Sequence, residues 1–234
     1  RMHFRGGIGA SMRRKEWRLL LRDASLFSQL GLQIVYTVPL VVVLLKSGAL
    51  PPTFAIAPAI VVITAQVAAS LAWITVSGED APELIATAPV TASVADRSKL
   101  SAIALPVIAI VALPLAGLAM LSPKAAALAA ILAAAAATST ALINLWHPMP
   151  GNRRGMLRRH QQSKVIGLVE HALSFLWAIG SVMVMIGSAF AVVPLGVVGA
   201  ILWFGRSRAH GRPAKPVAVN SRPIAASAVG VAAT

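Results

Sequence analysis

Long uncharged apolar stretches alternate along this chain with short segments that hold nearly all of its charge. Runs of 22, 32, 24 and 28 residues without Lys, Arg, Asp or Glu follow Asp23, Lys46, Lys99 and Lys124. The hydrocarbon core of a bilayer is about 30 Å thick, and a helix needs about 20 residues to cross it. Each run is therefore long enough to span a membrane. The pattern predicts an all-α, polytopic membrane protein.

Turn signals divide these runs into six predicted transmembrane helices. Pro51-Pro52 and Ser122-Pro123-Lys124 are turn sequences between apolar runs, and Gly187-Ser188 interrupts a final apolar run that is too long for one helix. The predicted spans are 25–45, 53–76, 100–121, 125–146, 165–186 and 189–204. Together they form a transmembrane domain of residues 25–204.

The charge distribution predicts how the six spans are oriented. The chain is 57% hydrophobic and 12% charged, and its net charge is +14. In a soluble protein this charge would suggest nucleic acid, but basic residues of membrane proteins collect in cytoplasmic loops. All of the 21 Lys and Arg residues except Lys46 and Lys124 fall on one side of the six-span arrangement. We therefore predict a membrane protein with both termini in the cytoplasm and no nucleic-acid partner.

The two ends of the chain differ from the spans. Residues 1–24 include SMRRKEWRLLLRD, which places Trp17, Leu20 and Leu21 on one helical face and Arg14, Arg18 and Arg22 on another. This pattern predicts an amphipathic helix at the membrane interface, although a simple positive flank would also orient the first span. Residues 205–234 have no periodicity and are predicted to be a disordered, basic cytoplasmic tail in reach of membrane lipids. Because the sequence starts at Arg1, we expect a fragment or a processed segment of a longer protein.

The segment between the second and third spans is the acidic part of a basic chain. Ser77 is suited to cap a short helix whose first turn contains Glu79, Asp80 and Glu83. Pro89 would end that helix, and Thr91 or Ser93 would cap a second short helix that ends at Lys99. Two short cytoplasmic helices predict a docking element for a partner, while the alternative is a hairpin that only joins two spans.

Polar residues within the spans are the candidate intramembrane sites. Glu170 is the one acid inside a predicted span, and acids there are usually functional. Because it lies six residues after Lys164, about 9 Å along a helix, we expect it at the headgroup level, paired with Arg158 or Arg159; a role in a substrate path is the alternative. The other candidates are Gln29, Gln33, Gln66 and Asn144. Such residues usually bond one helix to another, each pair adding about 0.6 kcal/mol.

Motifs for catalysis and metal binding are missing from the sequence. It contains no G-x-x-x-x-G-K-[ST] phosphate loop, no G-x-S-x-G and no H-E-x-x-H. Its five histidines fall at the edges of spans or in loops, and there is no cysteine. We therefore expect no catalytic residue, no metal site and no cofactor bound by this chain.

Three segments resemble the permeases of ABC-2-type exporters. The stretch GEDAPELIATAPV is similar to their cytoplasmic loop, KEWRLLLRD to their first cytoplasmic helix, and WHPMPGNRR to a basic loop that follows later. The resemblance covers roughly residues 12–175 and is closest to the carboxy-terminal half of long, fused permeases.

This resemblance implies a six-span permease that pairs with a second permease half or forms a homodimer, and that is driven by cytoplasmic ATPase subunits that bind the ATP. It also implies which residues couple the permease to the ATPase: Glu79, Asp80, Glu83, Leu84, Pro89 and Lys99. Two other functions stay open on the residues alone. One is a secondary transporter driven by protons through Glu170 and His171, and the other is a membrane scaffold without transport activity.

Overall fold

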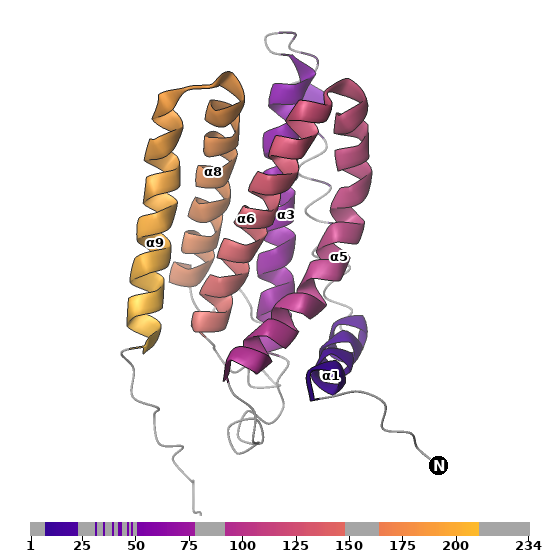
Figure 1. Cartoon of the computed structure of the whole chain (residues 1–234), viewed down its shortest axis with the longest axis vertical. Helices are drawn as coiled ribbons and strands as arrows, with labels where there is room; N and C mark the ends of the chain where they lie inside the picture. Colours follow the sequence, from indigo (N-terminus) through magenta and orange to yellow (C-terminus); the bar gives the residue numbers. More distant parts are fainter. Residues whose placement is uncertain are drawn as a thin grey trace, which may run out of the picture.

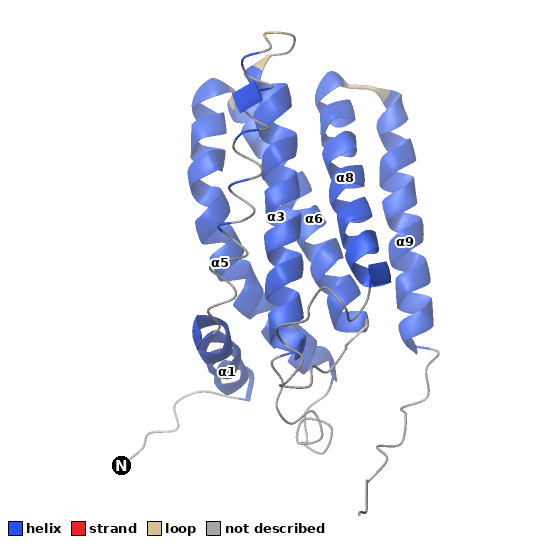
Figure 2. Ribbon diagram, turned by 180° about the vertical axis from the view of Figure 1, so that it is seen from behind, coloured by secondary structure: helices blue, strands red, loops and turns tan. Residues whose placement is uncertain are grey.

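A computed structural model describes residues 8–22, 51–77, 92–147 and 164–210, together with seven isolated positions between 31 and 48. All regular structure in these residues is helical (Figure 1, Figure 2). Five of the helices are long and apolar enough to cross a membrane. The elements are α1 (Ile8–Arg22), α3 (Pro52–Ser77), α5 (Ala92–Leu121), α6 (Pro123–Trp146), α8 (Lys164–Ile186), the 3-10 helix η2 (Ala189–Ala191) and α9 (Val192–His210).

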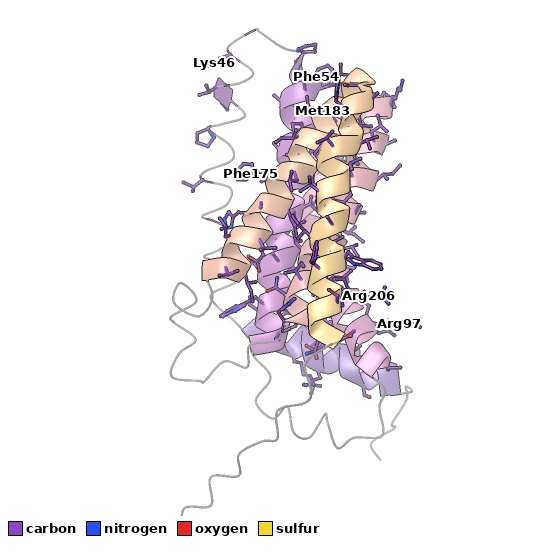
Figure 3. The ribbon with its side chains drawn as sticks, turned by 90° about the vertical axis from the view of Figure 1, so that its left-hand side faces the viewer. Lys46, Phe54, Arg97, Phe175, Met183 and Arg206 are labelled. Carbon is purple, nitrogen blue, oxygen red and sulfur yellow. The ribbon has the colours of Figure 1, made fainter. Side chains whose placement is uncertain are left out.

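The five long helices run side by side in alternating directions, and α1 lies across one end of the bundle (Figure 1). Apart from Lys46 and Lys124, the described basic residues lie at the end that carries α1. Arg97 and Arg206 lie at this end, and Lys46 lies at the other (Figure 3). The unequal distribution of basic residues between the two ends of the bundle thus agrees with the sequence pattern. Which end faces the cytoplasm stays a prediction.

Helices α3 and α6 form the centre of the bundle. About half of each apolar stretch is buried, 56% in α3 and 50% in α6, against 22% in α5 and 17% in α9. The buried face of α6 consists mainly of alanines, among them Ala129, Ala133 and Ala136. Since alanine adds little side-chain bulk, the backbones of two helices can approach closely. The alanine-rich helix α6 therefore packs centrally.

Two tight connections join consecutive helices at the end opposite α1. The Ser122 hydroxyl accepts a hydrogen bond from the Ala125 amide, and Pro123 occupies the first turn of α6, where its missing N–H costs nothing. Gly187 follows α8 with a φ of 76°, a conformation that glycine adopts without a steric penalty. Ser188 then caps η2 through the Phe190 amide. These two connections lie at the positions where the sequence predicts breaks between spans.

The helix bounds differ from the sequence prediction in two places. The predicted short helix that ends at Lys99 is instead the first part of α5, because Ala92–Leu121 is one continuous helix and Ser93 lies inside it. The last span does not end at Phe204, since α9 continues to His210 and takes up the start of the predicted tail. The predicted first span, 25–45, falls almost wholly outside the described residues, so five of the six spans are found.

Candidate functional site: a buried polar network

A polar network lies between α3, α6 and α8, within a bundle that is otherwise almost entirely apolar. Three of the residues predicted as intramembrane polar sites meet in it, namely Gln66 from α3, Asn144 from α6 and Glu170 from α8. Residues far apart in the sequence thus form one site. Gln29 and Gln33, the other two, lie outside the described residues.

The central contact joins Asn144 and Glu170. The Asn144 Nδ2 donates a hydrogen bond of 2.7 Å to the Glu170 Oε1 and a second, of 3.1 Å, to the Thr140 carbonyl one turn earlier. Asn144 is 4% exposed and Glu170 is 5% exposed. The amide is held by its own helix, so it presents its donor to the carboxylate in one orientation. A carboxylate buried in this way would be costly without such a partner.

Further hydrogen bonds connect the same three helices. The Ser174 hydroxyl, one turn after Glu170, donates to the Glu170 carbonyl and accepts from the Gln66 Nε2 at 3.1 Å, which ties α8 to α3. The Thr140 hydroxyl donates to the Ala65 carbonyl at 2.9 Å and ties α6 to α3. The Trp177 Nε1 donates to the Ser139 hydroxyl at 2.9 Å and ties α8 to α6. Every pair among the three helices is therefore linked by at least one hydrogen bond.

The structure corrects the expected orientation of Glu170. We expected the side chain to face the headgroups and to pair with Arg158 or Arg159, which lie outside the described residues. The carboxylate is instead turned toward α6 and is almost completely buried. His171, its neighbour in sequence, is exposed, and its Nδ1 lies 2.7 Å from the Gly167 carbonyl. The two residues thus point to different surroundings.

The network has the chemistry of a polar binding site or a proton site. A carboxylate oxygen can accept a hydrogen-bond donor, a cation or a proton. Among the described residues, no group of three or more His, Cys, Asp and Glu side chains could hold a metal ion. The acceptor that the network places within the bundle is the carboxylate of Glu170.

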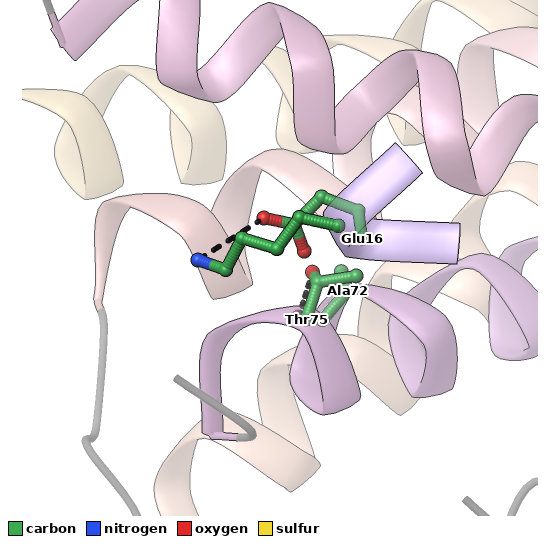
Figure 4. A network of polar contacts seen from close by, with 4 residues as sticks. Glu16, Ala72 and Thr75 are labelled. Carbon is green, nitrogen blue, oxygen red and sulfur yellow. Dashed lines mark hydrogen bonds and ion pairs between the residues drawn. The ribbon is translucent and has the colours of Figure 1, made fainter. Parts of the chain in front are cut away.

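A second buried acid was not predicted. Glu16 on α1 is 0% exposed, and its Oε1 lies 3.9 Å from the Lys15 Nζ. Figure 4 shows its carboxylate beside Ala72 and Thr75 near the end of α3. The Thr75 hydroxyl donates to the Ala72 carbonyl at 2.8 Å.

Leu20 and Trp17 bring α1 into contact with the apolar core. Leu20 is 3% exposed, Trp17 packs against the same cluster, and Arg14 and Arg18 are exposed. The predicted amphipathic helix is therefore present, and its inner face contains an acid as well as apolar side chains. Helical spacing could have revealed this, because Glu16 lies four residues before Leu20 on the same face.

Most residues predicted to couple to an ATPase lie outside the described part of the chain, namely Glu79, Asp80, Glu83, Leu84 and Pro89. Lys99 is described and is half-buried in the second turn of α5, at the α1 end of the bundle. Ser77 is the last residue of α3. The short helix that it was predicted to cap falls within residues 78–91, which lie outside the described residues.

On α8, sequence reasoning missed the network residues Ser174 and Trp177. Both lie on the face of α8 that carries Glu170, at positions four and seven residues later, and this spacing was the available signal. Comparison with protein-family models, with curated proteins and with solved structures gives no match. The fold and the polar network are therefore the basis for inferring function.

Proposed function

We propose that this chain is a permease subunit, or half of a permease, of an exporter that resembles the ABC-2 type. It would form the membrane path in a bacterial inner membrane and pair with a second half or a second copy. Separate cytoplasmic ATPase subunits would bind and hydrolyse the ATP.

The position of α1 is the observation that carries this proposal. Helix α1 packs against α3 and α5 at the end of the bundle where α3 ends and α5 begins. The acidic segment between these two helices therefore starts and finishes beside α1. A protein that docked on this segment would lie next to a helix that is anchored in the bundle by Leu20 and Trp17. A displacement at this surface would thus be passed on to α3 and α5.

The experiment that tests this proposal is co-purification followed by ATPase measurement. The full chain is expected to retain a phosphate-loop ATPase encoded beside it. Replacing Glu79, Asp80 and Glu83 together by Ala is expected to leave membrane insertion intact and to abolish substrate-stimulated ATP hydrolysis. Unchanged stimulation in the triple variant would reduce the acidic segment to a connector.

A proton-driven secondary transporter is the second candidate function. The burial of Glu170 against Asn144 favours it, because carboxyl groups inside membrane bundles serve as proton sites in pumps and transporters. Proton relays usually chain several ionisable groups, and among the described residues no second acid shares the network. This argues for the first candidate.

Reconstitution in vesicles separates the two functions. Transport that requires ATP and the partner ATPase, and that persists without a pH gradient, supports the exporter. Transport that the full chain carries out alone, driven by a pH gradient and lost in Glu170→Gln, would replace it with the secondary transporter.

A further inference from the structure

A groove lies between α1 and the first turns of α5, and the polar network has no part in it. Its volume is about 330 Å³, and it is lined by Ala10 and Arg13 from α1 and by Val94, Arg97, Ser98 and Ser101 from α5. Ligand sites in proteins begin at about 300 Å³, so the groove is large enough for a small polar group. It lies at the basic end of the bundle.

The two arginines give the groove its chemistry. Arg13 and Arg97 come from different helices and are both exposed, so that their guanidinium groups are accessible from solvent. Neither has an ion-pair partner among the residues that the structure describes. Guanidinium groups bind phosphate oxygens through paired N–H donors. The Ser101 hydroxyl donates to the Ser98 carbonyl at 2.9 Å, so the two guanidinium groups are the phosphate donors of this lining. Such a lining is complementary to a phosphate.

An apolar strip continues from this groove along the outer face of α5. Positions 97, 101, 105 and 108 follow helical spacing and are all exposed, and Leu105 and Ile108 are 56% and 63% exposed. Both belong to the part of α5 that is apolar enough to cross a membrane. A molecule whose phosphate lies between the arginines could therefore place an acyl chain on this strip without leaving the surface of α5.

We propose that the groove between α1 and α5 binds the headgroup of an anionic phospholipid, with its phosphate between Arg13 and Arg97 and an acyl chain along Leu105 and Ile108. An interfacial helix that lies next to a basic pocket at the end of a transmembrane helix is a suitable arrangement for this ligand. The bound lipid would join α1 to α5 at the membrane surface. This proposal does not depend on whether the protein transports a substrate.

The test is native mass spectrometry of the detergent-solubilised full chain, titrated with phosphatidylglycerol or phosphatidylcholine. The wild type is expected to retain phosphatidylglycerol in preference to phosphatidylcholine. Arg13→Gln with Arg97→Gln should weaken phosphatidylglycerol binding by roughly thirtyfold, since each basic residue near an anionic lipid contributes about a fivefold factor. Arg14→Gln with Arg18→Gln is the matched control. It removes the same charge from exposed positions of α1 that do not line the groove, and it should bind as the wild type does.

Four results would overturn the proposal. They are no preference for phosphatidylglycerol in the wild type, equal losses in the two double variants, wild-type binding in the groove variant, and displacement of the lipid by an equal concentration of inorganic phosphate. Displacement by inorganic phosphate would mean that the apolar strip contributes nothing to lipid binding. If the Gln variant does not fold, Arg13→Lys with Arg97→Lys keeps both charges and loses the paired donors. We expect it to bind severalfold more weakly than the wild type, and full retention would contradict a phosphate held by the guanidinium groups.

Discussion

The contact between Asn144 and Glu170 allows a quantitative prediction about the bundle. Both side chains are about 95% buried, and the donor and acceptor atoms are 2.7 Å apart. Glu170→Gln keeps an acceptor oxygen at the same position but removes the acid, whereas Asn144→Ala removes the donor. The two changes combined form a double-mutant cycle on one hydrogen bond.

The size of the effect follows from the nature of the acceptor. Hydrogen bonds between transmembrane helices contribute about 0.6 kcal/mol on average and at most about 1.7 kcal/mol. Bonds to charged groups lie near the upper end, at about 1.5–3 kcal/mol in folded proteins. We expect Asn144→Ala to lower the free energy of unfolding by about 1.5 kcal/mol in the wild type and by about 0.6 kcal/mol in the Glu170→Gln background. The difference between the two losses, about 1 kcal/mol, is the coupling energy of the pair. It would measure how much the charge of the acceptor strengthens the hydrogen bond.

The assay is reversible unfolding of the full chain in mixed micelles, followed by circular dichroism as the fraction of denaturing detergent rises. Leu168→Ala, on the exposed face of α8, is the control and should change the unfolding free energy by less than about 0.5 kcal/mol. Equal losses from Asn144→Ala in the two backgrounds would refute the argument, since the carboxylate would then add nothing to the contact.

Three further predictions concern packing, a turn and orientation. Ala136→Leu, at a fully buried position of α6, should destabilise the bundle by about 1–3 kcal/mol through overpacking, whereas Ala134→Leu on the exposed face should be nearly neutral in the same unfolding assay. Gly187→Ala should cost about 1–2 kcal/mol because of its φ of 76°, even though no atom blocks the added methyl group; an unchanged unfolding free energy would contradict this. Because the chain contains no cysteine, Lys124→Cys should react with a membrane-impermeant maleimide in intact cells, and Arg206→Cys only after permeabilisation; the reverse pattern would invert the topology.

The ends of the spans could be predicted from sequence because they depend on composition and turn chemistry. The predicted span 53–76 corresponds to the helix Pro52–Ser77, and the predicted span 165–186 corresponds to the helix Lys164–Ile186. In both cases, a polar or proline-containing segment marks the limit of an apolar run. The start of α5 could not be found in this way. Its first turns contain Asp96, Arg97 and Lys99, which are typical of a surface segment. The helix nevertheless runs through them, and residues 92–99 include no proline or glycine.

The orientation of side chains within the bundle was harder to predict. A soluble helix shows its inner face by an apolar stripe, but a transmembrane helix is apolar on every face, so the stripe is lost. The sequence therefore indicated that Glu170 was unusual without showing whether it faced lipid headgroups or α6. The evidence was in the polar residues of other helices. Asn144 and Gln66 become partners of the α8 face only once α3, α6 and α8 are packed together.

Helix α3 connects the two buried acids of the described bundle. Near its end, Ala72 and Thr75 lie beside Glu16 of α1, and Gln66 reaches the Ser174 hydroxyl in the network. Thr75 and Gln66 are nine residues apart, which is about 13 Å along a helix. No proline or glycine falls between them, so this part of α3 is a regular helix that can shift as a unit. Helix α3 is therefore in contact with α1 at one point and with the polar network at another.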